Sequence, residues 1–586
     1  MSSSSLKRDP EESLADRRKR LKAHAEAHFK STRAAWADLP PDALRLVVKR
    51  AADVAGSSVP VVPAVASVCR AWRDAAHAHP SELWRRADFS GDFDPSDAVI
   101  ARYCRDGHWR ALEHLDLRDC PRVSDKALDA LFVDDARRGA PALSSLFASD
   151  VDDDRKRTNG AGKTGKNGKR GISVDGLVRV LERAPITFGT VEIDRCHVRS
   201  GVERERLSRA LFANGASRVA LALRDAPRMF ANVAPFVAPA GMPLLTKLDL
   251  TDSGGGAGGA VLPWVDLMAK CPAMRELRLN GLGGAQGWEP KPRLGSSNDP
   301  FGNPSATRAR RVPFSQKDFS LSPRGFPHLE VLELGAARLT TSTGYDLGPS
   351  GVSFGLLFRL LFASRNLREL DVTGARESLS LGAFRRERDD PSGILTRLGI
   401  APETLVGTLF CERGESPLRV LRCARTGWAG GGGRPDGVRA AFFVESSDDA
   451  LPGAPARRSP RFPDLRVLEL GSRGAHAPRF GDEDLVTVVA ACHGTLERLA
   501  IAGSAVTDAG AACALARLSP FARLDLSHCR GISRETRRAS EGGDLARARR
   551  EAAANADAAR VAALDRMCVA CAGAPESAGG DDDENG

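Results

Sequence analysis

Residues 112–120 read LEHLDLRDC, and this stretch decides the fold class. Leu112, Leu115 and Leu117 are separated first by two residues and then by one, and Cys120 follows. The alternation in the middle of the stretch is typical of a short strand with one buried face, because successive strand side chains point to opposite sides. Such a stretch buries little apolar surface alone. It therefore predicts a repeat that becomes stable only when it is stacked on its neighbours.

The same L-x-x-L-x-L spacing recurs through the rest of the chain. Several adjacent starts lie about 25 to 31 residues apart, which suits one strand and one helix per turn of a solenoid. Helical segments such as 172–185 and 481–494 carry a polar residue where a helix cap is expected and then an apolar face. The register starts at Leu112, Leu143, Phe188, Leu245, Met274, Leu329, Leu367, Leu418, Leu465, Leu496 and Phe521, with a weaker start near Arg218.

A separate helical unit is predicted ahead of the repeats, over residues 36–90. The string LPPD at 39–42 is typical of a helix start, with proline in the first turn and an aspartate that favours the helix dipole. Apolar residues then recur at helical spacing over 44–48 and 65–72. Between these two stretches, residues 52–63 contain a glycine and two prolines, which indicates a connection.

These two parts resemble the F-box/leucine-rich-repeat family, in its cysteine-containing repeat type. Leu-Pro at 39–40, Val-Cys-Arg-Ala-Trp at 68–72 and Leu-Trp at 83–84 match the F-box anchors, although the connection at 52–63 is longer than usual. The strings CPRVSDKAL, SAVTDAGAACAL and LDLSHCRGIS resemble the cysteine-containing repeats. The resemblance implies an α/β protein in which an N-terminal helical F-box is followed by a leucine-rich-repeat solenoid of horseshoe shape.

The domain boundaries follow from these patterns and from changes in composition. Three inserts rich in glycine, proline or charge interrupt the repeats and are expected to be disordered. The predicted parts are a disordered basic segment at 1–35, the F-box at 36–90, the solenoid at 91–532 with inserts at 150–171, 283–324 and 427–461, and a C-terminal helix with an acidic disordered tail at 533–586.

The resemblance also implies a function, that of the substrate-recognition subunit of a Skp–cullin–F-box ubiquitin ligase. The F-box would bind a Skp-family adaptor and through it a cullin, and the repeats would bind a protein substrate. Two alternatives stay open, a leucine-rich scaffold or regulatory protein outside any ligase and a receptor gated by a small ligand. The residues that match the family's adaptor-binding motif are Leu39, Pro40, Leu44, Val68, Trp72 and Trp84.

A column of acidic residues is the candidate substrate-binding site. One position lies between the two inner leucines of each strand, and stacking brings successive members of this column to about 5 Å from one another. An acidic groove would suit a basic segment of a substrate. The alternative is that aspartate is common in LDLS-type strands for reasons unrelated to binding. The acidic members are Asp116, Glu192, Asp249, Glu333, Asp371, Glu469 and Asp525, and Arg278 and Arg422 interrupt them.

Charge and composition argue against several other classes of protein. The net charge is +10, but the basic excess lies largely in short runs such as 17–22, 163–170, 308–311 and 547–550, so nucleic-acid binding is not favoured. The run at 17–20 is either a nuclear-import address or a solvated helix face. No apolar stretch approaches the about 18 residues of a membrane span, and the N-terminus lacks the apolar core of a secretory signal. We expect reduced cysteines and a cytoplasmic or nuclear location.

Catalytic and metal-binding motifs are weak. The string GAGKTGKNGKR at 160–170 approaches a phosphate loop, but Asn167 replaces the Ser or Thr that binds magnesium, so a flexible insert is favoured. Cys568 and Cys571 have metal-ligand spacing, yet a zinc site needs four ligands and no second pair lies near them in the sequence. The sequence therefore predicts a non-catalytic protein that needs no cofactor or metal.

Overall fold

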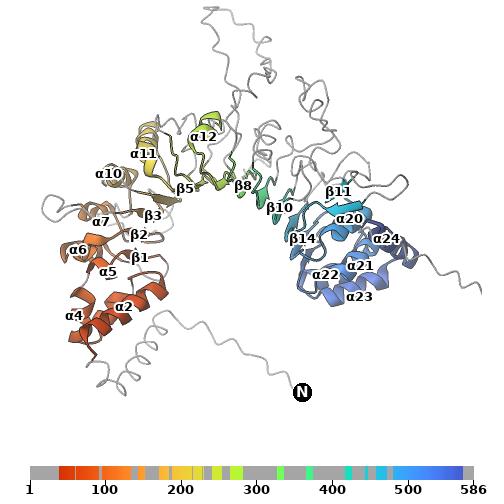
Figure 1. The fold of residues 1–586 in the computed structure, drawn as a ribbon, viewed down its shortest axis with the longest axis horizontal. Coiled ribbons are helices and arrows are strands. Elements are labelled where there is room, and N and C mark those ends of the chain that lie inside the picture. The colour runs from red at the N-terminus through yellow and green to blue at the C-terminus, as the bar shows by residue number, and fades with distance from the viewer. Residues whose placement is uncertain are drawn as a thin grey trace, which may run out of the picture. The chain divides into compact units, whose positions relative to one another are not determined.

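The computed structural model shows the helices and strands of a mixed α/β protein (Figure 1). The chain falls into two compact units. Met1–Ala148, with Thr164–Ile172 and Arg183–Pro185, forms the first unit, and the other residues as far as Gly586 form the second. The predicted segment 1–35, the insert 283–324 and the phosphate-loop-like string 160–170 lie outside the described residues. The residues that the structure describes are 39–59, 61–78, 80–90, 95–132, 143–151, 171–183, 188–213, 215–226, 229, 241–253, 264–281, 326–335, 364–373, 416–424, 442–446, 457–471 and 480–571.

The first unit begins with four helices, α2 (Pro41–Ala55), α3 (Val61–Ala66), α4 (Arg70–Ala78) and α5 (Pro80–Leu83). Pro41 occupies the first turn of α2, where the missing N–H costs nothing. Gly56 ends the helix with φ of 71°, a left-handed conformation that glycine adopts without strain. The connection predicted over 52–63 is shorter in the structure, because helix continues to Ala55 and resumes at Val61.

The first unit continues with the strands β1 (Arg86–Asp88), β2 (His114–Leu117) and β3 (Ser145–Ser149), which pair in parallel in chain order. Helix α6 (Asp97–Arg105), the 3-10 turn η1 (His108–Ala111) and α7 (Asp125–Ala130) lie between strands in the chain. Strand β1 starts the sheet one strand earlier than the leucine spacing predicts. The reason is that Ala87 and Phe89 are buried where later strands carry leucines.

The second unit contains ten of the described strands in one parallel ladder that also follows chain order. The central leucine of each strand pairs in register with that of the next, so a continuous buried leucine column forms, from Leu221 to Leu524. The strands are β4 (Thr190–Asp194), β5 (Ala220–Arg224), β6 (Lys247–Asp249), β7 (Glu276–Arg278), β8 (Val331–Glu333), β9 (Glu369–Asp371), β10 (Val420–Arg422), β13 (Val467–Glu469), β14 (Arg498–Ala500) and β15 (Arg523–Asp525).

Helices of the second unit lie along one side of this sheet (Figure 1). Polar contacts between successive helices recur at their first turns. Asp482, the first residue of α20, accepts hydrogen bonds from the N–H and hydroxyl of Thr507, the residue that precedes α21. Asp508, the first residue of α21, does the same with Ser533 before α22. The described helices before the C-terminal group are α10 (Val174–Arg183), α11 (Gly201–Ala213), η2 (Gly215–Ser217), α12 (Trp264–Lys270), α20 (Asp482–Cys492) and α21 (Asp508–Arg517).

The C-terminal region differs from the single helix predicted. Three helices follow the last strand, α22 (Arg534–Glu541), α23 (Leu545–Asn555) and α24 (Ala558–Cys571). The breaks fall at two adjacent glycines, 542–543, and at 556–557. Helices α23 and α24 pack against α20 and α21, so they cover the end of the repeat array. Helix α22 packs against the last strand, β15, and the breaks after it let the two later helices fold back over α20 and α21.

The insert predicted as disordered over 427–461 contains two described strands. These strands, β11 (Phe443–Ser446) and β12 (Arg457–Pro460), pair antiparallel as a separate two-stranded sheet. Phe442 and Phe462, at the ends of this pair, meet edge to face with ring centroids 5.5 Å apart, and both are buried. The aromatic anchors explain the order: they bury apolar area that a purely polar insert lacks.

Two of the predicted repeat starts, Arg218 and Phe521, do not place a buried apolar side chain at that position. Arg218 is buried at the position that leucine holds in neighbouring repeats, and its guanidinium donates to the carbonyls of Phe188 and Leu211. Burial without a carboxylate partner lowers the pKa of Arg218 to about 10. Phe521, predicted as a buried start, is instead 91% exposed, and the preceding Leu518 is buried.

Candidate functional site

The residues predicted to bind an adaptor separate into a buried set and a surface set. Leu44, Trp72 and Trp84 belong to the core of the first unit. Leu39 is half-buried, and Pro40 is exposed at the start of α2. Val68 is 36% exposed. The binding role of all six residues stays a prediction, and only the exposed ones are available to a partner without unfolding.

Exposed apolar side chains on α2 add to this surface, and the sequence reasoning missed them. Leu46, Val47 and Val54 are exposed by 58%, 38% and 75%. At about 100° per residue they project away from the buried stripe formed by Leu44 and Val48. Their exposure could have been predicted from the helical spacing of that stripe, because Val47 does not fall on it.

An aromatic cluster connects the helices of the first unit to its first strands. Trp84 contacts both Tyr103 on α6 and His108 on η1, with ring centroids 5.1 Å from each, and these two rings lie 6.2 Å from one another. His108 also stacks on His77 of α4 at 4.5 Å. Burial lowers the pKa of both histidines, and the nearby charges of Arg73 for His77 and of His77 for His108 act in the same direction. Asp106 opposes these shifts.

Acidification is therefore expected to destabilise the first unit. A histidine whose pKa is lowered by folding takes up its proton more readily in the unfolded state. The free energy of unfolding therefore has its full value above about pH 6.5, and it declines as the pH falls below that value. Thermal unfolding between pH 7.5 and 5 measures this slope. The double variant His77→Gln, His108→Gln is expected to have a shallower slope, and an unchanged slope would contradict the assignment.

The acidic column lies on the strands as predicted, but its members are held by intramolecular contacts. Four of the seven members are aspartates, and each of them accepts a hydrogen bond from the backbone N–H two residues later. This hydrogen bond closes a turn at the end of the strand. The donors are Arg118, Thr251, Thr373 and Ser527. This contact explains aspartate at the position without any ligand. The four aspartates are Asp116, Asp249, Asp371 and Asp525.

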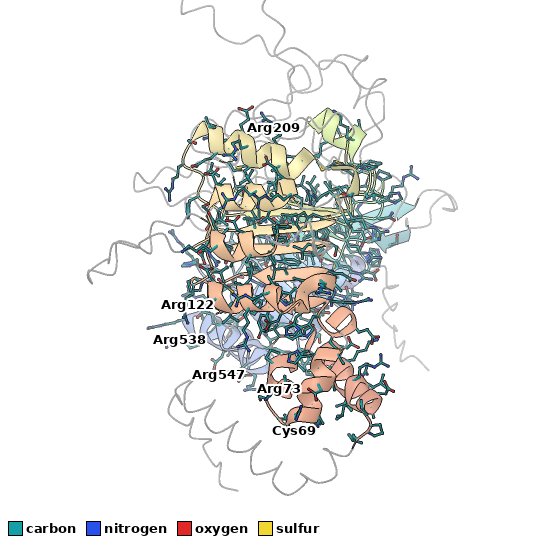
Figure 2. All side chains as sticks on the ribbon, turned by 90° about the vertical axis from the view of Figure 1, so that its left-hand side faces the viewer. Cys69, Arg73, Arg122, Arg209, Arg538 and Arg547 are labelled. Carbon is teal, nitrogen blue, oxygen red and sulfur yellow. The ribbon has the colours of Figure 1, made fainter. Side chains whose placement is uncertain are left out.

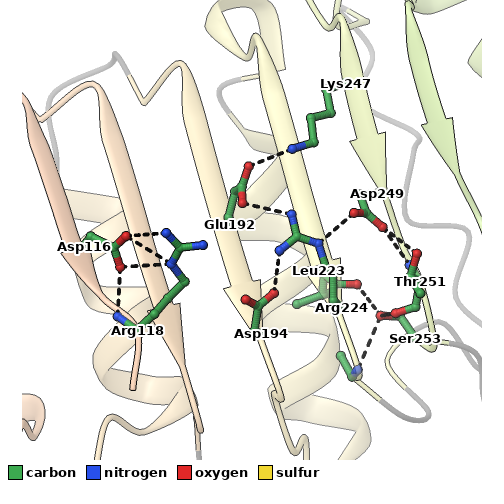
Figure 3. Close-up of polar contacts among 11 residues, drawn as sticks. Asp116, Arg118, Glu192, Asp194, Leu223, Arg224, Lys247, Asp249, Thr251 and Ser253 are labelled. Atoms are coloured by element: carbon green, nitrogen blue, oxygen red, sulfur yellow. Dashed lines mark hydrogen bonds and ion pairs between the residues drawn. The ribbon is translucent and has the colours of Figure 1, made fainter. Parts of the chain in front are cut away.

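Around Glu192, basic residues neutralise the column (Figure 3). Ala222 occupies the column position between Glu192 and Asp249, and its small side chain leaves room for a long side chain from the same strand. Arg224 fills this space and donates to Glu192, Asp194 and Asp249 at 2.9, 3.0 and 2.7 Å.

Charge compensation determines the protonation state of this network. Burial alone would raise the pKa of Glu192, but hydrogen bonds and attraction from Lys247 and Arg224 outweigh it and hold that pKa below its ordinary value. The three carboxylates around Arg224 outweigh its burial and raise the pKa of its guanidinium. The network is therefore ionised on both sides at neutral pH.

The same compensation continues along the column. Arg278 pairs with Glu333, which also accepts a hydrogen bond from Asn280 at 2.6 Å. Burial raises the pKa of Glu333, and the neighbouring Asp371 adds to this, although Arg278 opposes it. Glu469 pairs with Arg422 at 3.7 Å and with Arg498 at 3.3 Å.

In the first unit, Asp116 pairs with Arg118 (Figure 3). The guanidinium of Arg118 also lies over the ring of Phe147. Together these contacts leave little uncompensated negative charge in the column. Glu192, Asp249, Glu333 and Asp116 are buried, and a basic segment would have to displace their arginines. Substrate binding by the seven acids stays a prediction, and the half-buried Asp371 and Asp525 are the members with the fewest basic partners in the described part of the chain.

Metal-binding and membrane-spanning features are not found among the described residues. They contain no group of three or more His, Cys, Asp or Glu side chains arranged to hold a metal ion. Cys568 and Cys571 lie buried on α24, where burial raises the pKa of Cys568. No described helix is both long and apolar enough to cross a membrane.

The comparisons with known proteins give a weak likeness in fold, seen among solved structures. No family model matches the chain, and no curated protein matches it. Among solved structures it is similar to a chain from the crystal structure of the Rad7 and Elc1 complex in yeast, with 13% sequence identity and a TM-score of 0.37. The match covers 84% of this chain and 94% of that chain. A likeness of this size is too weak to transfer a function, so the chain's own residues must support one.

Proposed function

We propose that the chain is the substrate-recognition subunit of a Skp–cullin–F-box ubiquitin ligase. The observation that supports this most is the exposed apolar surface on the four-helix segment whose sequence resembles an F-box. Pro40, Leu46, Val47, Val54 and Val68 are exposed there. Exposed apolar residues gathered on one short segment are typical of a surface that a partner covers.

The mechanism that follows is one of proximity. The helical segment holds the adaptor, and the strand face of the repeats holds the substrate. A target tethered in this way meets the transfer site at an effective concentration of order millimolar, far above its free concentration. The transfer chemistry belongs to other subunits, and this chain contributes position and specificity.

The apolar surface on α2 gives a direct test. The double variant Leu46→Asp, Val54→Asp is expected to lose at least a hundredfold in affinity for a purified Skp-family adaptor, because burying each apolar side chain contributes about 1.5–3 kcal/mol. Titration calorimetry of the full chain measures the loss. Circular dichroism is expected to show an unchanged melting temperature, since both side chains are exposed.

A matched control separates this effect from a general one. Val202 and Leu244 are equally exposed but lie in the second unit, and the double variant Val202→Asp, Leu244→Asp is expected to bind adaptor like wild type. Equal adaptor binding by the α2 variant and wild type would overturn the assignment of this surface. A wild-type chain that binds no adaptor would favour the alternative of a leucine-rich scaffold.

A further inference from the structure

A second row of charged residues runs beside the acidic column, one position before the strands. We call it the arginine row, and each member is joined to the next through the backbone. The N–H groups of Glu330, Arg368, Arg419, Arg466 and Glu497 donate to the carbonyl of the preceding member at 2.7 to 2.8 Å. The members in order are Arg275, Glu330, Arg368, Arg419, Arg466 and Glu497.

The centre of the row carries three adjacent arginines. Neighbouring strands lie about 4.8 Å apart, so the backbone positions of Arg368, Arg419 and Arg466 span only about 10 Å. Arg368 and Arg466 are each more than half exposed, and Arg419 is exposed. Like charges at this spacing repel, and water screens them only in part.

In the described part of the chain, carboxylates pair with the two outer arginines of this triplet but not with the central one. Glu330 pairs with Arg275 and Arg368 at 3.2 and 3.4 Å, and Glu497 pairs with Arg466 at 3.1 Å. Among the described residues Arg419 has no carboxylate within ion-pair distance. The same position in earlier strands of the second unit is neutral, with Gly189, Val219 and Thr246, so the positive charge is local.

The contrast with the acidic column is informative. In that column of the second unit most acids meet a base through Arg224, Lys247, Arg278, Arg422 or Arg498. Repeats of this protein therefore compensate buried charge where the fold requires it. The three arginines at the centre of the row are exposed, and within the described residues Arg419 has no such compensation.

We propose that the arginine row binds an extended, Asp/Glu-rich segment of a partner protein. A span of about 10 Å matches about three residues of extended chain, and exposed guanidinium groups donate to carboxylates in bidentate geometry. Carboxylates delivered there would relieve the repulsion around Arg419. If the proposed function holds, this partner segment belongs to the ligase substrate, so the inference rests on that function only for the partner's role.

A nucleic acid fits the row less well than a short acidic peptide. Nucleic-acid surfaces are continuous basic stripes that follow many phosphates. Here Glu330 and Glu497 bound the arginine triplet on both sides and would repel a long polyanion. The row therefore favours a local cluster of acids within an otherwise neutral segment.

The test uses the full chain and a fluorescent twelve-residue peptide with alternating Glu and Ser. Anisotropy is expected to show binding that weakens as salt is raised, because exposed charges are screened. The triple variant Arg368→Gln, Arg419→Gln, Arg466→Gln is expected to bind at least tenfold more weakly. The control triple Arg538→Gln, Arg547→Gln, Arg550→Gln removes the same charge from the C-terminal helices (Figure 2) and is expected to change affinity less than twofold.

Other outcomes would overturn the proposal. Equal losses of affinity in the two triple variants would show that peptide binding depends only on net charge. Tighter binding of a single-stranded oligonucleotide than of the peptide would assign the row to nucleic acid. A chain ending at Cys571 that binds the peptide more than tenfold tighter would assign the row to the protein's own acidic end at 581–584. Adaptor binding is measured separately on the same variants, so failure here is distinguishable from failure of the proposed function.

Discussion

Replacing Trp84 by alanine is expected to lower the free energy of unfolding of the first unit by about 3–5 kcal/mol, the usual cost for a buried tryptophan. Trp84 is 1% exposed, and its ring packs against both Tyr103 and His108. Its removal leaves a cavity at the junction of the helical segment and the first strands. Because both parts pack on this one side chain, we expect them to lose stability together.

The serine contacts beside Trp84 explain why the two parts respond together. The N–H of Ser58 donates to the carbonyl of Arg86, and the Ser58 hydroxyl donates to the carbonyl of Leu83. The Ser57 hydroxyl accepts from the N–H of Asp88 at 2.9 Å. Ser57 and Ser58 thus join the end of the α2–α3 connection to both β1 and the end of α5, next to Trp84.

Native-state hydrogen exchange of the first unit measures this effect residue by residue. The amides of α2 and of β2 are expected to lose protection by a similar amount. Val54→Ala is the matched control, because its side chain is exposed and the cost is within about 0.5 kcal/mol. Loss of protection in α2 alone would show that the helical segment folds independently of the strands.

Replacing Asp482 by alanine is expected to cost about 3–5 kcal/mol in the C-terminal part of the second unit. The carboxylate is buried and accepts hydrogen bonds from the N–H and the hydroxyl of Thr507, both at 2.7 Å. Each hydrogen bond to a charged group contributes about 1.5–3 kcal/mol, and the variant leaves both donors without this acceptor. The ion pair with Arg560 adds less, because the arginine side chain is more than half exposed.

Local packing supports the same expectation. Gly510 lies against the Asp482 carboxylate so closely that a Cβ there would overlap it, which indicates a tightly fitted contact between α20 and α21. Urea unfolding followed by circular dichroism measures the cost. Asp175→Ala is the control, because among the described residues that exposed aspartate forms an ion pair only with the exposed Arg206, and its loss is expected to cost less than about 1 kcal/mol. Similar midpoints for the two variants would contradict the role given to Asp482.

Features that depend on local spacing were predictable from the chain alone. The strand positions and the leucine column follow from an alternation that repeats within a few residues, and burial of Leu115 and Leu468 agrees with it. The start of α2 at Pro41 follows from proline in the first turn. The location of the acidic column was predictable for the same reason. Each member lies between two apolar residues that point into the core, so its own side chain points to the other face of the strand.

Other features were missed because their causes lie outside the local pattern. Phe521 has the apolar character of a repeat start, but Leu518 and Ala522 are the buried residues around that turn. Arg218 occupies a leucine position because two backbone carbonyls accept from it. The breaks between the three C-terminal helices were missed because α23 and α24 pack on α20 and α21, and these contacts exist only in the assembled array.

The stacking of the strands determines which charged residues form ion pairs. Arg224 neutralises Glu192 and Asp249 from a different strand than either, and only the parallel register with Ala222 between them makes this possible. Arg368, Arg419 and Arg466 are far apart in the chain, and they form a row because ladder hydrogen bonds bring their backbones together. Alternation along a strand is a local property that sequence reveals, whereas neighbours across strands depend on the register and on side chains that reach over smaller ones.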